Sequence, residues 1–266
     1  MQAHQGLPDA GQIARIEEAS LNATVVPEQQ LYNGWLVRWA DSAAKRARSV
    51  NILAPSSAPL DERLDYVAGI YKRHDLPLIF RLTDGCPDAT LESALAARGF
   101  ESFGHTLVMT APMRVASDIA ARQEQGTRQL RVVDVQTFAA QVGRLKGASA
   151  QYISEHALRL SSVAVPKQML LAYDGQICVG AALGVFDGKL MGIFDVISDA
   201  ANRRQGIAAQ LLRAQLQEGD KQGATQAYLQ VETGNQPARA LYARYGFTNH
   251  HQYWYMSLAG GQGNHQ

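Results

Sequence analysis

The sequence predicts a mixed α/β protein made of two similar halves, each a mixed, largely antiparallel sheet flanked by helices. Three observations lead to this prediction. The stretch "SALAARGF" at residues 93–100 recurs as "ALYARYGF" at residues 240–247. Strand-like and helix-like segments precede both copies in the same order. The chain has 266 residues, of which 46% are hydrophobic, so it is long enough to bury two cores of ordinary size.

The second half begins with two helical patterns, at residues 135–145 and 151–160, and then changes to the period of strands. Three apolar runs fill residues 167–198, separated by two Asp-Gly pairs, which are strong hairpin signals. We therefore expect an antiparallel meander. The elements expected after it are a helix that begins near residue 206 and ends before Gly223, a strand at 224–232, a helix at 235–245 and a strand at 247–257.

The first half follows the same order more loosely. Residues 34–40 and 46–53 are expected to pair as a hairpin. The elements expected after it are a helix at 60–74, a strand at 76–82, a helix at 88–98 and a strand at 100–110.

The boundary between the halves is expected at residues 115–127, where apolar content falls and Gly126 interrupts the pattern. This boundary predicts one domain at 1–120 and another at 127–258. The tail at 259–266 is expected to be disordered.

Charge and composition argue against several classes of function. The chain has 25 Lys+Arg and 24 Asp+Glu, so it lacks the overall positive field that holds nucleic acid or an anionic membrane. The sequence contains neither a signal-peptide run nor an apolar segment of membrane-spanning length. Cys86 and Cys178 have no metal-ligand spacing, which favours a reducing compartment without a metal site. We expect a cytoplasmic monomer or homodimer that acts on a small molecule or peptide.

The segment "RRQGIA" at residues 203–208 lies between an expected strand and an expected helix. A glycine at a helix start lets a ligand approach the backbone, and the first N–H groups of the helix point outward at the positive end of its dipole. The two arginines add charge suited to a pyrophosphate, although arginines before a helix are also commonly just solvated. The anion site expected here consists of Arg203, Arg204, Gln205, Gly206, Ile207 and Ala208.

A second candidate feature lies downstream of this loop. Asn235 opens a helix with Pro237 in its first turn, which makes it a good N-cap. Tyr242 falls on nearly the same helix face, while Leu241 and Tyr245 form a separate apolar stripe that can do the packing. Capping alone would explain Asn235, but the Tyr242 hydroxyl is expected to be available for hydrogen bonding.

These two segments resemble the hallmarks of the GNAT superfamily of N-acetyltransferases. "RRQGIA" is similar to its pyrophosphate loop, and "LQVETGNQPARALYARYGF" is similar to its strand, asparagine, helix, tyrosine and closing Gly-Phe. The resemblance implies two GNAT-like halves in tandem, acetyl-CoA as co-substrate, a pantetheine arm on the strand backbone near residues 195–198, and Tyr242 as a general acid near the sulfur. The cofactor-binding residues implied are Val196, Ile197, Ser198, Arg203, Arg204, Gln205, Gly206, Ile207, Ala208, Asn235 and Tyr242.

The implied reaction moves an acetyl group to a primary amine of a small molecule or peptide by direct attack. The amine must be neutral to attack, so a base is needed, directly or through water. The candidates are Asp195, Glu232 and Glu155; a water chain is an alternative, and each carboxylate could be only structural. Because a fold does not establish turnover, a non-catalytic acyl-CoA-binding sensor or interaction protein remains the alternative function.

The first half resembles a degenerate copy of the same fold. Leu95 stands in the place of the tyrosine and Asp88 in the place of the asparagine, and a matching glycine loop is missing, so we expect no CoA binding there. Arg46, in a basic hairpin stretch, and Glu155 are expected to contact the acceptor, with a solvated surface as the alternative for Arg46.

Overall fold

The structure, a computed structural model, describes residues 9–123 and 126–259. The described residues form two compact units, and each unit is assembled from segments far apart in the sequence. The first unit lies within Met1–Arg15, Val26–Leu107 and His251–Gln266, and the second within Ile16–Val25 and Val108–His250. The tail expected to be disordered, residues 259–266, lies outside the described part except for its first residue.

The first unit is a small mixed sheet with two helices. In chain order its elements are β1 (Gln29–Tyr32), β2 (Trp35–Arg38), the short helix η1 (Lys45–Ala47), β3 (Val50–Ile52), α2 (Leu60–Arg73), β4 (Ile79–Thr83) and α3 (Leu91–Ala96). The predicted hairpin is confirmed, because β2 pairs antiparallel with β3. The core of the unit includes Trp35, Tyr71 and Phe80, all fully buried.

The second unit contains the predicted meander and the helices around it. Its elements are α4 (Met113–Ala121), β6 (Gln129–Val132), α5 (Val135–Lys146), α6 (Ala150–Ser162), β7 (Lys167–Asp174), β8 (Ile177–Asp187), β9 (Leu190–Ser198), the short helix η2 (Ala200–Asn202), α7 (Ile207–Lys221), β10 (Gln226–Glu232) and α8 (Gln236–Ala243). Strands β7, β8 and β9 pair antiparallel in sequence, which confirms the meander. Strand β10 then pairs parallel with β9.

Three elements contribute residues to both units: α1 (Ala10–Asn22), β5 (Phe100–Pro112) and β11 (Thr248–Leu258). The strand order is β1-β2-β3-β4-β11 on the side of the first unit and β5-β10-β9-β8-β7-β6 on the side of the second. The end of β11 pairs antiparallel with β4, from Tyr253 opposite Thr83 to Ser257 opposite Ile79. The last strand of the chain therefore belongs mainly to the first unit.

The compact units differ from the predicted domains 1–120 and 127–258. Residues 108–120 belong to the second unit and residues 251–258 to the first. The boundary expected at residues 115–127 overlaps the helix α4, which begins at Met113 and has Met113, Ala116 and Ala120 buried at helical spacing. This apolar face was not recognised in the sequence because two of its three residues are alanines. Alanine is often buried but contributes little to a helical hydrophobic pattern.

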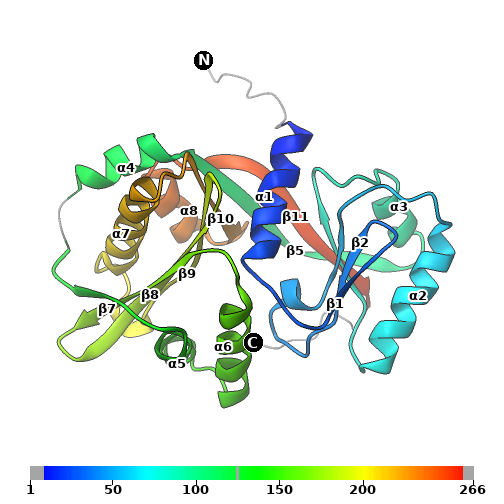
Figure 1. Cartoon of the computed structure of the whole chain (residues 1–266), viewed down its shortest axis with the longest axis horizontal. Coiled ribbons are helices and arrows are strands. Elements are labelled where there is room, and N and C mark those ends of the chain that lie inside the picture. The colour runs from blue at the N-terminus through cyan, green and yellow to red at the C-terminus, as the bar shows by residue number, and fades with distance from the viewer. Residues whose placement is uncertain (1–8, 124–125, 260–266) are drawn as a thin grey trace. The chain divides into compact units, whose positions relative to one another are not determined.

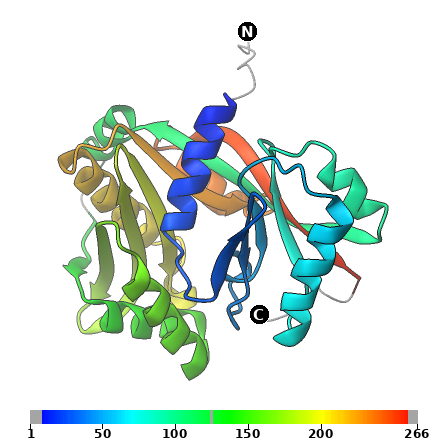
Figure 2. The same ribbon diagram turned by 45° about the vertical axis from the view of Figure 1, so that its right-hand side comes forward.

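The sheet of the second unit is covered on both faces (Figures 1 and 2). Side chains of α5 and α6 pack with Met169 and Leu171 of β7 on one face. Ile207 and Leu211 of α7 pack with Leu170 and Ala172 of the same strand on the other face. Because successive residues of a strand point to opposite faces, β7 separates the two helical layers.

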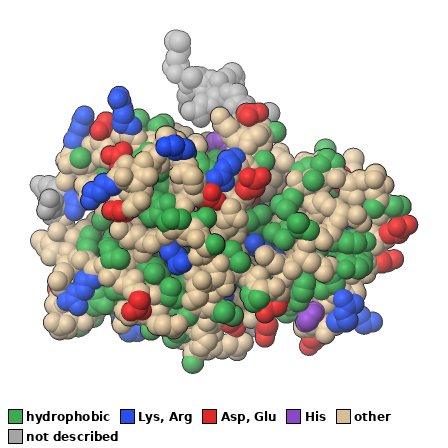
Figure 3. All heavy atoms as spheres, in the orientation of Figure 1, with side chains coloured by type: hydrophobic (Ala, Val, Ile, Leu, Met, Phe, Trp, Pro, Cys, Tyr) green, Lys and Arg blue, Asp and Glu red, His purple; other side chains and the backbone are tan. Residues whose placement is uncertain are grey.

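Charges of both signs are interspersed on the surface shown in Figure 3, where Lys and Arg side chains lie among Asp, Glu and apolar ones. This distribution matches the formal net charge of +1. Among the described residues, no helix is long and apolar enough to cross a membrane. The same residues include no group of three or more His, Cys, Asp or Glu side chains that could hold a metal ion.

Candidate active site

The predicted anion loop leads into the longest helix of the second unit. Gly206 is the N-cap of α7 and has a φ of 78°, in the left-handed region that glycine adopts without strain. A Cβ added at Gly206 would meet no atom within 4 Å, so the space in front of the loop is open. The first N–H groups of α7 have no carbonyl partner within the helix. They are available to an anion at the positive end of the helix dipole.

The arginines of the loop are exposed and uncommitted. Arg203 is extended, whereas Arg204 has a φ of 61°. Within the described part of the chain, neither side chain makes an ion pair or hydrogen bond. Gln205 differs, because its Oε1 atom accepts a hydrogen bond of 2.6 Å from Nη2 of Arg128. The loop therefore carries two positive charges, on Arg203 and Arg204, that have no partner among the described residues. The Gln205 side chain is held in place by Arg128.

Strand β9 is bulged and separates from β10 close to this loop. Leu183 of β8 lies opposite Phe194, but Ala181 lies opposite Ile197, so β9 has one extra residue in this stretch. Asp195 lies in the bulge with a φ of 46°. The parallel pairing with β10 ends at Ile193 and Leu229, although both strands continue. Beyond this point the edge of β9 that faces β10 is open for backbone hydrogen bonds to a ligand.

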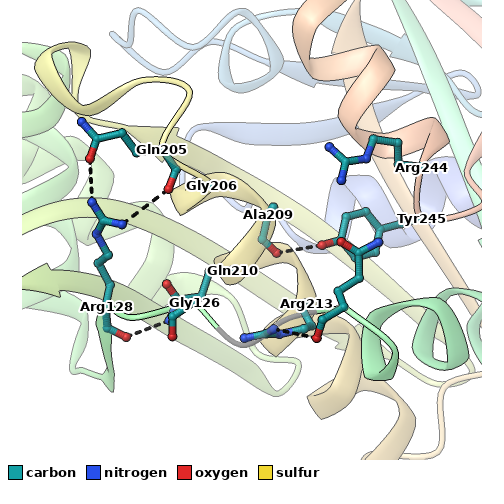
Figure 4. Close-up of a pocket in the computed structure, with 10 residues that line it drawn as sticks. Gly126, Arg128, Gln205, Gly206, Ala209, Gln210, Arg213, Arg244 and Tyr245 are labelled. Carbon is teal, nitrogen blue, oxygen red and sulfur yellow. Dashed lines mark hydrogen bonds between the residues drawn. The ribbon is translucent and has the colours of Figure 1, made fainter.

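A pocket of about 370 Å³ lies beside Gly206 (Figure 4). Three of its lining residues are arginines: Arg128, Arg213 and Arg244. Arg128 and Arg213 are held by backbone and side-chain oxygens, whereas the side chain of Arg244 comes from the turn after α8. The pocket brings positive charge to the side of the α7 N-terminus. These three arginines were not predicted from the sequence, because they come from separate segments of the chain.

Asn235 and Tyr242 lie at the two ends of the short helix α8. The Asn235 side chain accepts a hydrogen bond of 3.2 Å from the backbone N–H of Ala238, so it caps the helix as predicted. The Tyr242 ring is buried against Phe247, with 6.2 Å between the ring centroids. The expectation that Tyr242 stays outside the packing was therefore wrong for its ring, because a helix of two turns buries more than one stripe.

The Tyr242 hydroxyl, by contrast, is uncommitted. Within the described residues it has no hydrogen-bond partner. Burial disfavours the charged phenolate and raises the pKa of Tyr242 to about 12. Its neighbour Tyr245 has the packing role that was predicted, because it is 1% exposed and its hydroxyl donates to the carbonyl oxygen of Ala209 at 3.1 Å. Tyr242 therefore keeps its proton at neutral pH and is free to donate it.

A polar cluster surrounds Asp195 in the bulge. Its Oδ1 atom lies 3.2 Å from Nζ of Lys146, and its Oδ2 atom lies 3.1 Å from Nε2 of His156. Lys146 also donates to the Tyr152 hydroxyl at 2.7 Å. Burial alone would raise the pKa of Asp195, but the hydrogen bond from His156 and the charge of Lys146 outweigh it and hold the pKa well below the usual range. Asp195 is therefore firmly ionised.

The helices that carry this cluster are in close contact. A Cβ at Gly143 of α5 would lie 2.2 Å from Cγ1 of Ile153 in α6, so only glycine allows this approach. Arg144 donates a hydrogen bond from Nη2 to the backbone oxygen of Cys178 in β8. These contacts place Lys146 of α5 and His156 of α6 on the same side of the bulge. Asp195 was predicted from the sequence, but its partners Lys146 and His156 were not. The one signal in the sequence is that Tyr152, which bonds Lys146, and His156 lie one helical turn apart on α6.

The other predicted residues lie in different surroundings. Glu232 is exposed at the end of β10 and its backbone oxygen accepts from the N–H of Asn235 at 2.9 Å. Glu155 is half-buried on α6, 3.9 Å from Nη1 of Arg159, so it has a structural partner. Arg46 lies in the first unit, near Arg38. Burial of Arg38 and the charges of Arg81 and Arg46 lower the pKa of Arg38 to about 10. Acceptor contacts by Glu155 and Arg46 stay predictions.

Comparison with solved structures identifies the fold. A GCN5-related N-acetyltransferase from Kribbella flavida is 16% identical with a TM-score of 0.69, covering 97% of this chain and 98% of that one. A tandem GNAT protein from the clavulanic acid biosynthesis pathway is 12% identical with a TM-score of 0.66, covering 96% and 90% of the two chains. At these identities the likeness concerns the fold. No curated protein matches the sequence.

The sequence model of a family described as "Probable histone acetyltransferase Rv0428c C-terminal" matches residues 10–256. The chain belongs to this GNAT family of acetyltransferases. It is therefore an acyltransferase by family, with the tandem architecture that the repeat predicted. GNAT acetyltransferases use acetyl-CoA, and the loop, the bulge and the uncommitted tyrosine all lie in the second unit.

The first unit of this GNAT protein lacks these features at the equivalent positions. Leu95 is fully buried in its core. Asp88 accepts a hydrogen bond of 2.8 Å from the Thr90 hydroxyl and lies 3.6 Å from Nη2 of Arg63. Both side chains therefore stabilise the unit, which agrees with the predicted degeneracy of the first half.

Proposed function

We propose that the protein transfers an acetyl group from acetyl-CoA to a primary amine of a small molecule or peptide, by direct attack in the second unit. One observation carries this proposal. Strands β9 and β10 stop pairing at Ile193 and Leu229, immediately before the bulge and the loop that leads to α7. A thioester arm needs such an open strand edge, and its pyrophosphate needs the free N–H groups of a helix start.

The residues present fit acetyl-CoA along its length. Residues 196–198 offer the open backbone edge of β9 to the amides of the pantetheine arm. Arg203, Arg204 and the N–H groups of residues 205–208 suit the pyrophosphate. The three arginines of the pocket in Figure 4 suit a further phosphate at the nucleotide end. When bound, acetyl-CoA supplies the activated acetyl thioester.

The side chains of the second unit divide the proton transfers between them. The Tyr242 hydroxyl, which is neutral and has no hydrogen-bond partner among the residues that the structure describes, donates to the sulfur as the thiolate departs. Asp195 is a weak base because its pKa is held low by His156 and Lys146. Glu232, exposed at the end of β10, is the carboxylate better suited to accept the proton of the amine, directly or through water.

The direct test is thiol release from acetyl-CoA in the presence of a panel of amines. The panel includes amino acids, polyamines, aminoglycosides and a lysine-rich peptide, because the family description names histone as an acceptor. We expect release of CoA that depends on one class of amine, with the acetylated product seen by mass spectrometry. CoA binding without turnover on any amine would instead support an acyl-CoA sensor, which is the alternative function.

The substitution Gly206→Ala is expected to weaken CoA binding about tenfold, because the added methyl occupies the open space before the loop and strains a left-handed residue. Gly223→Ala is the matched control. Gly223 lies just after the C-terminal end of α7 and has a φ of 76°. A Cβ added there would also meet no atom within 4 Å. Both variants should lose similar stability, and only Gly206→Ala should lose affinity in calorimetry. Equal affinity of the two variants would exclude the loop as the pyrophosphate site.

The substitution Arg244→Glu is expected to lower the affinity for CoA about tenfold but to change the affinity for dephospho-CoA much less, because the latter lacks the 3′-phosphate. Arg114→Glu makes the same charge change at an exposed residue of α4 that does not line the pocket, and serves as the control. Calorimetry with both ligands measures the effect. If both ligands lose affinity equally in Arg244→Glu, the pocket does not read the 3′-phosphate.

A further inference from the structure

The polar cluster at the β9 bulge joins three elements through one carboxylate. We propose that Asp195, held between Lys146 and His156, is a positioning residue that fixes the open edge of β9, and is not the base that deprotonates the acceptor. This inference rests on the proposed function, since the edge in question is the one assigned to the pantetheine arm. It also assigns Lys146 and His156, which lie outside the loop at residues 203–208, the role of holding Asp195 in place.

The backbone at Asp195 needs such support. Its φ of 46° is uncommon for a residue with a side chain, although aspartate and asparagine adopt it more readily than most. The bulge interrupts the pairing with β8 at this residue, and the pairing with β10 has already ended at Ile193. Residues 195 and 196 therefore lack the regular ladder bonds that hold other strand residues. Side-chain contacts have to fix this stretch instead.

Those contacts reach two helices at once. Lys146 is the last residue of α5, and His156 lies in the middle of α6. Each bonds a different oxygen of Asp195, so both oxygens of the carboxylate are engaged. A base that has to collect a proton from a substrate needs a pKa near the working pH. The two bonds of Asp195 instead stabilise its charged form and hold its pKa well below that range, and an anchor requires both of these bonds.

The His156 ring is itself held in place. It is 5% exposed, and the Phe138 ring packs against it with 6.1 Å between centroids. Its Nδ1 atom is buried and has no hydrogen-bond partner among the described residues. Its Nε2 atom lies 3.1 Å from Oδ2 of Asp195, so the proton on Nε2 faces the carboxylate. His156 thus donates to Asp195 and is not placed to touch the acceptor.

The experiment compares Asp195→Ala with Asp195→Asn in the full chain. Asparagine tolerates the backbone conformation and keeps an acceptor for Lys146, so it should restore much of what alanine loses. We expect the Kd for CoA to rise about tenfold or more in Asp195→Ala and clearly less in Asp195→Asn. His156→Phe, which keeps the ring and removes the bond to Asp195, should weaken CoA binding in the same direction.

Two further readouts separate anchoring from base catalysis and from general destabilisation. Hydrogen exchange of residues 194–198 in the free protein should speed up in Asp195→Ala. Asp134→Ala removes the N-cap of the same helix α5, where Asp134 accepts from the N–H of Thr137, and should lower the Tm without altering the Kd for CoA. The acid limb of the pH profile of kcat/KM should persist in Asp195→Asn.

The opposite results would overturn the inference. An unchanged Kd and unchanged exchange in Asp195→Ala would show that the cluster does not fix the edge. Equal loss of kcat in both Asp195 variants, with normal CoA affinity and loss of the acid limb, would make Asp195 the base. If the wild-type protein binds no CoA, the proposed function fails, and the exchange measurement on the free protein still decides whether Asp195 holds the bulge.

Discussion

A chain shortened to residues 127–266 is expected to yield no soluble, cooperatively folded protein, although it contains every motif of the active half. Residues 108–112 of β5 lie next to β10 in the second unit, and the shortened chain lacks them. It also lacks α4, whose Met113 side chain contacts α7 at Gly219. Ala23, which packs in the core with Phe138 and Val142, is missing as well.

The size of this effect follows from burial. Each large apolar side chain in a core contributes about 1.5–3 kcal/mol, so losing several of them removes an amount comparable to the roughly 5–15 kcal/mol that stabilises a whole domain. Soluble yield, size-exclusion chromatography and thermal melting measure the result. A chain of residues 9–259 keeps every described helix and strand and should melt like the full-length protein. A shortened chain that melts cooperatively would instead support the domain division expected from the sequence.

The substitution Tyr242→Phe is expected to lower kcat about 10- to 1000-fold, because it removes the only proposed proton donor for the departing thiolate. The ring and its contact with Phe247 stay, so the fold and the Kd for CoA should change little. Stopped assays of thiol release give kcat, and calorimetry gives the Kd. Wild-type turnover in this variant would show that Tyr242 only packs against its neighbours. The proposed acetyl transfer would then have no assigned general acid.

Tyr245→Phe is the matched control for this experiment. It removes a hydroxyl that donates to the carbonyl oxygen of Ala209, so it should cost about 1 kcal/mol of stability and leave turnover nearly unchanged. The pH dependence offers a second check. The pKa of Tyr242 is raised to about 12 in the folded protein, so loss of its proton should not reduce activity near pH 10, where ordinary tyrosines ionise. The burial of the neutral phenol stabilises the fold fully below about pH 10, and this contribution is lost as the pH rises above that value.

The sequence by itself determined those features that depend on neighbours along the chain. The Asp-Gly pairs specify tight turns, and the meander of β7, β8 and β9 follows from them. Gly206 specifies the start of α7 because glycine adopts the left-handed φ of 78° without strain. Asn235 specifies the start of α8 because its side chain accepts from the N–H of Ala238, three residues away. The helix ending repeated at residues 93–100 and 240–247 predicted two similar halves, because it can be read along the chain without knowledge of the fold.

Only the tertiary structure decided the features that depend on contacts through space. Lys146 and Asp195 are 49 residues apart, and nothing local to either indicates that they meet. The low pKa of Asp195 results from burial, which raises it, and from a hydrogen bond and a nearby charge, which outweigh burial, so only the tertiary structure shows that this aspartate is firmly ionised. The assembly of each unit from separate chain segments also depends on contacts through space. The pairing of β11 with β4 joins residues far apart in the chain, and no local signal in either strand specifies its partner.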